Sequence, residues 1–499
     1  MPENLPEYNQ KPPAAHNRRL AIIGGGLSGI AAAEYALRQG FQPEIFEWSG
    51  TLGGRLASFS VPNFSALTVD EEIDNGQHIL MNCNTALTGL HKRLQLEEFF
   101  IQCPALLFIN QDGKQYPLRP SGFLPFRWKF LFSFLRFPFL SFGDRIKTLS
   151  LLKKLGQSAA KQSTEQSKKC FSDFLAEYNV SARCIESFWS PLVLSSLCET
   201  PENVCTQAVA DVVNGMFFSD DSTAGTALPL HIPAVSLKSI YHTAVSEKLR
   251  QQGIPVHHFS RVKRLYWEEA TETEQRRVFA LELANGEALD FDYFMLAVPI
   301  WRARNILNHS ELEDYVNGLG LERFESGVVT TVHLRLNRPL LSASQPAAVL
   351  LNGIGQFLVY HQAEQDETAE SKQNGFKHTV TISASHRLLS DEELTAKGSA
   401  LITEKILNQL SRSFPAAFSL DKQEPLKVLH SRVTTYFEAA FSPDTSVYSE
   451  RPTQQTPFCN LALAGDWTQT GLPATMEGAV SSGQKAVDVL IKDCGGELQ

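Results

Sequence analysis

Three glycines near the start of the chain have the spacing of a nucleotide-binding turn. They follow the apolar run Arg19–Ile23, which predicts a buried strand, and an Ala-rich stretch that predicts a helix comes directly after them. In such a unit the glycines let a pyrophosphate approach the backbone, and the N-terminus of the helix stabilises its negative charge. The turn therefore predicts a dinucleotide site. Its members are Gly24, Gly26, Leu27, Ser28 and Gly29.

A carboxylate stands where the ribose of such a nucleotide is expected. Glu47 ends the next predicted strand, Pro43–Glu47. Its oxygens can accept hydrogen bonds from the ribose hydroxyls, whereas its charge repels a 2′-phosphate. The position of Glu47 therefore supports a dinucleotide site and disfavours NADP.

A second glycine turn follows closely. In Gly53-Gly54-Arg55, a backbone turn and a guanidinium could hold the same pyrophosphate as the first turn.

The C-terminal part of the chain indicates that this dinucleotide is FAD. Gly465 is expected to turn a short strand toward the cofactor, and Asp466 to bond the ribityl chain. A helix expected from about Ala474 would aim its N-terminus at the pyrimidine ring of the flavin, so Thr475 and Met476 are further candidate contacts. Since no cysteine adjoins this motif in the usual attachment position, we expect the FAD to be non-covalent.

The elements that must position these residues alternate along the chain. Further strands are predicted at Val256–Val262, Val278–Leu283, Leu289–Ala297 and Asn460–Ala464, and Val262 is a further candidate cofactor contact. The predicted fold class is α/β with α+β insertions: a Rossmann-like FAD-binding domain with an interleaved substrate domain. Residues 1–18 are expected to be a mobile lead. The FAD-binding domain is predicted over 19–100, 205–300 and 425–499, and the substrate domain over 101–204 and 301–424.

The inserted blocks differ in character. Residues 100–205 are expected to be mostly helical, whereas Val328–Leu336 and His378–Ser383 read as strands and Asp391–Ser413 as a helix. Two polar stretches, Gly156–Lys169 and Ala363–Asn374, are expected to be exposed helix ends or loops.

Composition excludes several classes of protein. The formal net charge of −9 argues against a nucleic-acid partner, which usually selects a basic surface. The 8 cysteines show no paired or ligand-like spacing, so neither a metal site nor a disulfide framework is expected. The N-terminal residues have no apolar core typical of a secretory signal, and we find no apolar run long enough to span a membrane. We therefore expect a cytoplasmic protein.

The two ends of the chain resemble the superfamily of FAD-dependent amine oxidases and carotenoid desaturases. Within it, Ile73–His78, Ala464–Thr468 and Gly471–Thr475 closely resemble the hydroxysqualene dehydroxylases, a family of bacterial squalene-associated desaturase-like enzymes. The resemblance runs from about Arg19 to Leu490 and is loose in the inserted blocks. It implies a reductive reaction on a long-chain isoprenoid, in which the allylic alcohol hydroxysqualene loses its hydroxyl and gains a hydride to become squalene.

Such a reaction requires a group that helps the hydroxyl leave as water. His78, as an imidazolium, could donate that proton because the ordinary pKa of histidine is about 6.5. Asp74 and Gln77 could orient the ring or the flavin edge, and Gly76 would let the backbone approach the flavin. In an extended segment, Gln77 and His78 point to opposite faces, so we expect only one of them to face the flavin. The alternative is that this whole segment only shapes the flavin pocket.

A Phe-rich segment, residues 122–143, carries eight phenylalanines interleaved with Arg127, Lys129 and Arg136. The charges and two interior prolines are incompatible with a spanning helix, whereas rings in the acyl boundary and cations at lipid head groups fit a peripheral contact. This contact would lie on the inner face of the cytoplasmic membrane. The alternative is a buried helical pair that lines the substrate domain.

Two other functions stay open from the sequence. One is an oxidative relative, either a carotenoid-type desaturase or an amine oxidase, for which Trp467 is the one suggestive aromatic side chain. The other is a prenyl-binding escort without catalysis. The electron donor is unidentified, because the chain has no second nucleotide-binding motif.

Overall fold

The computed structural model describes most of the chain. The described residues are 18–62, 71–120, 131–159, 164–218, 229–269, 275–361, 375–419 and 425–493. The predicted mobile lead lies outside them apart from Arg18. So do residues 122–130 of the Phe-rich segment, residues 160–163 of the polar stretch Gly156–Lys169, and the whole of the polar stretch Ala363–Asn374.

A parallel five-stranded sheet carries the glycine turns. Its strand order is β10-β2-β1-β14-β20, with β10 at Val256–His257, β2 at Gln42–Phe46, β1 at Arg19–Ile23, β14 at Tyr293–Leu296 and β20 at Leu461–Leu463. All four pairings are parallel. The central strands are almost continuously apolar because helices cover the sheet, as is usual for parallel sheets. The N-terminal, middle and C-terminal parts of the chain thus meet in one sheet.

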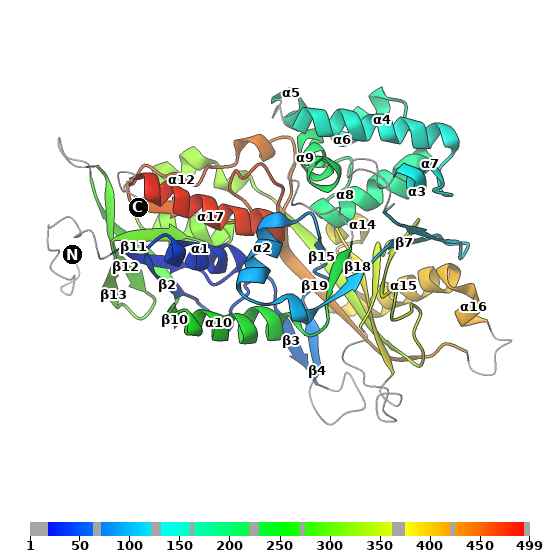
Figure 1. The fold of residues 1–499 in the computed structure, drawn as a ribbon, viewed down its shortest axis with the longest axis horizontal. Coiled ribbons are helices and arrows are strands. Elements are labelled where there is room, and N and C mark those ends of the chain that lie inside the picture. Colours follow the sequence, from blue (N-terminus) through cyan, green and yellow to red (C-terminus); the bar gives the residue numbers. More distant parts are fainter. Residues whose placement is uncertain are drawn as a thin grey trace.

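Two helices from opposite ends of the chain pack together beside this sheet. Helix α1 (Leu27–Arg38) and helix α17 (Met476–Asp493) lie side by side in Figure 1. A Cβ atom at Gly483 would lie 2.2 Å from the Ser28 carbonyl oxygen. Their backbones therefore approach closely only because residue 483 has no side chain.

Two of the predicted strands are each divided between two sheets. Val256–Val262 contains β10 and the start of β11 (Val262–Glu268), and Leu289–Ala297 contains the end of β13 (Ala288–Asp290) and β14. Strands β11 and β13 flank β12 (Arg277–Leu283) in a separate antiparallel sheet. The expectation of single strands was wrong here because the chain leaves one sheet and enters another within a few residues.

The second large sheet, called the second sheet below, has seven strands and is mixed parallel and antiparallel. Its order is β19 (Val428–Phe441), β15 (Ser326–Leu336), β18 (Phe376–Ile382), β17 (Phe357–Tyr360), β16 (Ala347–Leu350), β7 (Leu106–Ile109) and β8 (Gln115–Leu118). Helix α15 (Ser399–Ser413) covers one face, with Ile402, Ile406 and Leu410 packed on apolar side chains of β15 and β18. The opposite face of these strands carries polar side chains.

Strand β19 corrects one predicted boundary. It pairs with β15 along most of its length, so residues 428–441 belong to the second sheet rather than to the predicted FAD-binding segment 425–499. The block 100–205 is mostly helical from Leu131 onward, as expected, whereas residues 100–118 form strands. β19 pairs with β15 about a hundred residues away, and β7 pairs both with its neighbour β8 and with the distant β16.

A helical block packs beside the second sheet. Helices α4 (Phe142–Ala159), α6 (Phe171–Glu177), α8 (Ser190–Leu197) and α9 (Thr206–Phe217) lie at the opposite end of the molecule from β11–β13 (Figure 1). Their shared core is rich in aromatic side chains, including Phe171, Phe174, Phe188 and Trp189. No helix within the described residues is both long and apolar enough to cross a membrane.

Shorter elements connect these parts. The strands are β3 (Ser58–Val61), β4 (Glu71–Asp74), β5 (Leu80–Met81), β6 (Phe100–Cys103) and β9 (Leu230–Pro233). The helices are α2 (Thr85–Arg93), α3 (Leu131–Leu135), α5 (Thr164–Ser167), α7 (Ala182–Cys184), α10 (Val245–Gln251), α11 (Ile300–His309), α12 (Glu313–Leu319), α14 (Ser385–Leu388) and α16 (Pro415–Phe418).

Candidate functional site

The first glycine turn leaves no room for a side chain at Gly24 or Gly29. Gly24 has a φ of +112°, and a Cβ there would lie 2.5 Å from the Ala297 carbonyl oxygen. A Cβ at Gly29 would lie 1.9 Å from the Gly24 carbonyl oxygen. The turn therefore folds back on β14 and on the first turn of α1, which places the start of α1 at the carboxyl end of the sheet.

The N-terminus of α1 is available to an anion. Gly26 precedes the helix and has no side chain to cap it, so the first backbone N–H groups lack an intrahelical partner. The Ser28 hydroxyl donates to the Ala297 carbonyl at 3.4 Å, which leaves the backbone N–H of Ser28 for a ligand. Uncapped N–H groups at a helix N-terminus are a phosphate-binding arrangement.

The second glycine turn lies directly against the first. Gly26 and Gly53 form a parallel bridge, and the Gly53 N–H donates to the Gly25 carbonyl at 2.9 Å. A Cβ at Gly54 would lie 3.1 Å from the Gly26 Cα. The structure thus brings the two predicted turns together, as a shared pyrophosphate site requires.

Glu47 is buried beside the turns. Its Oε2 accepts the Gly25 N–H at 2.8 Å, while Oε1 accepts the backbone N–H and the hydroxyl of Ser49 at 2.9 and 2.8 Å. The carboxylate therefore orients the first turn, a role that the sequence did not predict. Carboxylate oxygens have several lone-pair sites, so hydrogen bonds from a ribose remain compatible with these contacts.

Backbone hydrogen bonds of Glu47 hold the segment that leads to Val262. Glu47 donates its N–H to the His257 carbonyl at 2.9 Å and accepts the Ser260 N–H at 2.8 Å. Val262 begins β11 two residues later and is buried. The structure therefore groups Val262 with the end of the site where Glu47 lies.

Arg55 and Asp466, from opposite ends of the chain, form an ion pair of 2.6 Å. The Arg55 guanidinium also donates to the Ala439 carbonyl at 2.9 Å. Burial disfavours the charge of Arg55, but the Asp466 carboxylate outweighs it and raises the pKa of Arg55 above its ordinary value. Arg55 therefore joins β19 to the C-terminal motif, in addition to following the second glycine turn.

A helix follows the C-terminal glycine motif as predicted, but α17 begins two residues later than the expected start at Ala474. Met476 is its first residue, and the Thr475 hydroxyl accepts the Gly478 N–H at 3.1 Å. Gly465 has a φ of +138°, which brings Asp466 round the end of β20. These residues lie together at the carboxyl end of the parallel sheet.

Arg451 supports the loop before α17 and was missed in the sequence. Its guanidinium donates to the carbonyls of Tyr448 and Leu472 at 3.1 and 2.7 Å and to Gln469 Oε1 at 2.8 Å. It is only 4% exposed. A single arginine in a loop carries no spacing signal, so these loop contacts could not be predicted.

The side chains of Gln77 and His78 point in different directions, as expected for neighbouring residues in an extended segment. Gln77 Nε2 lies 3.1 Å from His361 Nε2, and His361 Nε2 is in turn 3.0 Å from the Thr379 hydroxyl of β18. His78 Nδ1 lies 3.2 Å from the carbonyl oxygen of Gly76, whose φ is +149°. Gln77 therefore contacts His361, directly after β17 of the second sheet, whereas the His78 ring turns back toward the Gly76 carbonyl.

The environment of His78 bears on its predicted role as an acid. Burial lowers the pKa of His78 to about 4, with a further contribution from the charge of Arg55, although the bond to the Gly76 carbonyl opposes this. The ring is neutral at pH 7, and a carbonyl can only accept, so Nδ1 carries the hydrogen and Nε2 keeps a lone pair. The neutral ring offers Nε2 to a ligand as a hydrogen-bond acceptor, and the acid role of His78 stays a prediction.

Asp74, predicted to orient the His78 ring or the flavin edge, also anchors a loop. Its Oδ1 accepts the Ser58 hydroxyl at 2.7 Å and the Leu237 N–H at 3.0 Å. These contacts hold β3, β4 and the start of the segment before α10 together. Asp74 therefore positions the strand that leads to Gly76.

The polar face of the second sheet was missed in the sequence. On β15, Thr331, His333 and Arg335 alternate with apolar residues that pack under α15, and all three are buried. Polar residues at every second position of a strand expected to be buried were the available signal. A Cβ at Gly76 would lie 3.9 Å from the Thr331 hydroxyl oxygen, so this face adjoins Gly76.

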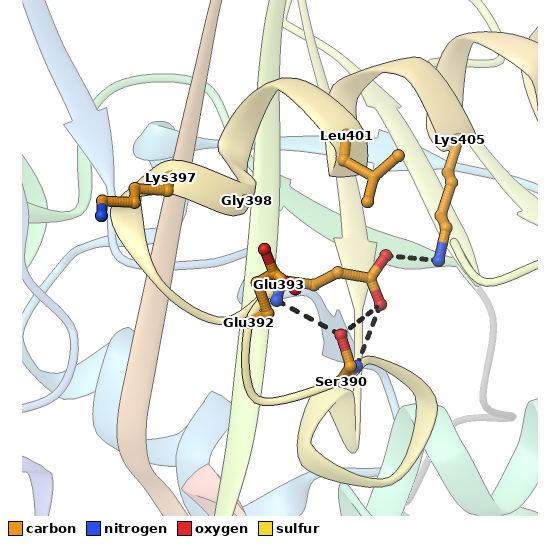
Figure 2. A pocket seen from close by; sticks show the side chains of 7 residues that line it. All are labelled: Ser390, Glu392, Glu393, Lys397, Gly398, Leu401 and Lys405. Atoms are coloured by element: carbon orange, nitrogen blue, oxygen red, sulfur yellow. Dashed lines mark hydrogen bonds and ion pairs between the residues drawn. The ribbon is translucent and has the colours of Figure 1, made fainter.

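A separate hollow with a volume of about 380 Å³ lies by the start of α15 (Figure 2). Its buried carboxylate, Glu393, accepts the N–H of Ser390 at 2.9 Å and pairs with Lys405. The polar groups therefore satisfy one another, and the hollow does not include the glycine turns. Within the described part of the chain, no cluster of side chains could hold a metal ion.

Comparison with known proteins gives one family match. The model of the family "Flavin containing amine oxidoreductase" matches residues 27–491. The hydroxysqualene dehydroxylase of Zymomonas mobilis is 24% identical over 480 residues, covering 94% of this chain and 98% of the relative. The zeta-carotene desaturase of a Synechocystis species is 23% identical over 509 residues, covering 95% of this chain and 97% of the relative.

A solved structure supports the same fold. Cyclohexylamine oxidase from Brevibacterium oxydans superposes with a TM-score of 0.63 at 16% identity, covering 96% of this chain and 100% of that one. Together with the family match, this likeness confirms the predicted α/β fold class.

Proposed function

The chain belongs to the family of flavin containing amine oxidoreductases and is an FAD-dependent oxidoreductase, and within that family we propose that it reductively dehydroxylates hydroxysqualene to squalene. The observation that carries this proposal is the alignment with a hydroxysqualene dehydroxylase along nearly the whole of both chains. The motif Ile73–His78, where the sequence closely resembles that enzyme family, is consistent with it.

The two glycine turns would hold the FAD at its pyrophosphate. We assign the anion to the N–H groups at the start of α1, where the missing side chains of Gly26 and Gly54 leave room for a close approach. Glu47 would face the ribose and Val262 the same adenosine end. This assignment fits the residues present, because a Cβ at most turn positions would clash.

The flavin end would lie between Gly76 and the start of α17. Asp466 would accept from the ribityl chain while paired with Arg55, and the N–H groups beyond Thr475 would face the pyrimidine ring. FAD bound here in its reduced form supplies a hydride and a proton, so that an allylic alcohol is converted into hydrocarbon and water. We expect the cofactor to be non-covalent.

The chain's own residues would hold and orient the alcohol. The neutral His78 ring presents an acceptor nitrogen, and Gln77 is held toward the second sheet by His361. The helical block, with the buried rings of Phe171 and Phe188 in its core, would form the apolar side of the substrate domain. These residues bind and shield; none of them carries a positive charge that would favour an anionic substrate.

The proposal is tested by product analysis. The purified flavoprotein, supplied with a chemical reductant under anaerobic conditions, should convert hydroxysqualene in detergent into squalene, identified by its mass. A matched reaction with the reductant and free FAD in place of the protein should give none. Intact hydroxysqualene after prolonged incubation with fully reduced enzyme would contradict the proposal.

A second candidate is oxidative desaturation of a carotene precursor. The full-length alignment with a zeta-carotene desaturase favours it. The two reactions move electrons in opposite directions, so they are distinguished by whether the substrate reoxidises reduced flavin or bleaches oxidised flavin. An amine substrate would also bleach the oxidised flavin.

We also propose a peripheral membrane contact at the Phe-rich segment. Phe132 and Phe142 are 51% and 69% exposed, and Ile146 nearby is 47% exposed. Phe134, Phe137 and Phe139 are instead buried in the core. The described part of the segment thus combines the two sequence interpretations, with some rings in the core and others free to enter a lipid surface.

A further inference from the structure

Two buried hydroxyl groups face the candidate site without a partner. Thr331 is 1% exposed and Thr381 is 8% exposed, and neither hydroxyl oxygen has a hydrogen-bond partner among the described residues. An unsatisfied buried hydroxyl is unfavourable, so native proteins rarely keep one without a reason. Two such groups at one place indicate a site for a polar ligand atom.

The two hydroxyls belong to one surface patch. Thr331 on β15 pairs directly with Thr381 on β18, so both side chains stand on the same face of the sheet. A Cβ at Gly76 would lie 3.9 Å from the Thr331 hydroxyl and 3.7 Å from the His78 ring. The patch therefore adjoins the segment that carries the candidate flavin-facing glycine.

Neighbouring polar groups on this face are already engaged. The Thr434 hydroxyl lies 3.2 Å from His333 Nε2, and the Thr379 hydroxyl lies 3.0 Å from His361 Nε2. The unpartnered hydroxyls are thus specific to Thr331 and Thr381, rather than general to the polar face.

The charges nearby do not suit an anion. Arg335, further along β15, is paired with Glu71 at 2.6 Å, and Lys377 lies 3.4 Å from the same carboxylate. The patch itself is neutral, and each threonine hydroxyl can both donate and accept. A neutral ligand hydroxyl, which also donates and accepts, matches it.

We propose that Thr331 and Thr381 bind the hydroxyl oxygen of the alcohol substrate and thereby select the alcohol over the corresponding hydrocarbon. This inference rests on the proposed function and adds the residues that recognise the leaving oxygen. The oxygen would bridge the two strands, with the acceptor Nε2 of His78 on the glycine side of the patch. The same contacts would hold the water that the reaction releases.

Equilibrium binding tests this subsite without turnover. The oxidised holoenzyme is titrated with hydroxysqualene and, separately, with squalene, and the change in flavin absorbance is recorded. Wild-type protein should bind the alcohol more tightly, whereas Thr331→Val and Thr381→Val should each reduce that preference by about tenfold and leave squalene affinity unchanged. The melting temperature of both variants should stay equal or rise, because each substitution removes an unsatisfied buried hydroxyl.

The matched control is Thr435→Val. Thr435 lies on β19, where its hydroxyl is 3.1 Å from that of Thr330, which pairs with Ser385 on the face away from the patch. It should keep the wild-type preference. Equal affinity of wild type for both ligands, or an undiminished preference in both patch variants, would overturn the subsite while the isoprenoid function stands. Failure of wild type to bind either ligand would overturn the proposed function and the subsite with it.

Discussion

At the scale of single residues, the candidate site depends on side chains that support the backbone as well as on those that would touch a ligand. Glu47 accepts the Gly25 N–H from within the first glycine turn. Arg55 reaches both Asp466 and the backbone of β19. In both cases a charged group that spacing identifies as a ligand contact also fixes the shape of the turn it belongs to.

Glu47 gives the first prediction. Glu47→Gln should weaken FAD retention by about tenfold, because a neutral amide is a poorer acceptor for the Gly25 N–H and for a ribose hydroxyl. The measurement is the flavin dissociation constant from fluorescence titration of the apoprotein. Glu44→Gln, three residues earlier on β2 and paired with Arg19 and His257, is the control and should retain wild-type affinity. Equal affinity of both variants would refute the ribose assignment.

Acid sensitivity is the second prediction. Burial lowers the pKa of His78 and His91 to about 4 and that of His333 to about 3. Since the unfolded pKa is about 6.5, the unfolded chain binds more protons than the folded one between these values, and stability falls as the pH drops from about 6.5 to 4. Each such histidine contributes up to about 1.4 kcal/mol per pH unit to this slope.

His91 offers a variant outside the site. His91→Gln keeps an acceptor for the Tyr241 hydroxyl, which lies 3.0 Å from His91 Nε2, and should reduce the slope of unfolding free energy against pH. The measurement is chemical denaturation at several pH values. His309→Gln, at the exposed end of α11, should keep the wild-type slope. An unchanged slope in H91Q would show that this histidine is not held neutral.

At the scale of elements, the loop before α17 depends on one buried arginine. Arg451 donates to two carbonyls and a side-chain amide across the segment 448–472, and its guanidinium stacks 4.2 Å from the Tyr448 ring centre. These contacts set where α17 begins, and hence where its N-terminus points.

Arg451→Lys is the third prediction. A lysine has one nitrogen and cannot reproduce the planar fork, so the free energy of unfolding should fall by about 2–4 kcal/mol and FAD affinity should fall with it. Thermal denaturation of the apoprotein and holoprotein measures both effects. Arg323→Lys, whose arginine pairs with Glu450 at the surface, should behave as wild type. Wild-type stability in R451K would contradict the role of this loop.

Local patterns predicted the elements whose partners lie nearby in sequence. β1, α1 and β2 were found because strand, glycine turn and helix follow one another within about one βαβ unit. The division of Val256–Val262 and of Leu289–Ala297 between two sheets was missed, because an apolar run in the sequence does not indicate which sheet its residues join. The Thr331–Thr381 pair was missed for the same reason: Thr381 lies on another strand, and only the pairing of β15 with β18 brings the two hydroxyls together.

At the scale of the whole molecule, the two large sheets contribute different parts of the candidate site. The parallel sheet gathers N-terminal, middle and C-terminal strands so that every glycine turn lies at one edge. The second sheet presents its polar face near Gly76 and carries the helical block beside it (Figure 1). Phe132 in α3 and Phe142 at the start of α4 are exposed. Both helices lie at the opposite end of the molecule from β11–β13 (Figure 1).

Membrane contact is the fourth prediction. The double substitution Phe132→Ser and Phe142→Ser should lower binding to anionic liposomes by about tenfold or more while FAD content stays unchanged, because both rings are exposed. Co-sedimentation with liposomes measures the effect. Phe259→Ser, which removes an equally exposed ring at 80% exposure near the parallel sheet, is the control and should sediment like wild type. Undiminished sedimentation of the double variant would contradict the contact.

The direction of electron flow tests the central claim most directly. The flavoprotein is reduced under anaerobic conditions, the reductant is removed, hydroxysqualene is added, and the flavin spectrum and the product mass are followed over a single turnover. We predict return of the oxidised flavin spectrum together with one squalene per flavin. Persistence of the reduced spectrum, with bleaching of the oxidised enzyme by a carotene precursor or an amine instead, would contradict reductive dehydroxylation.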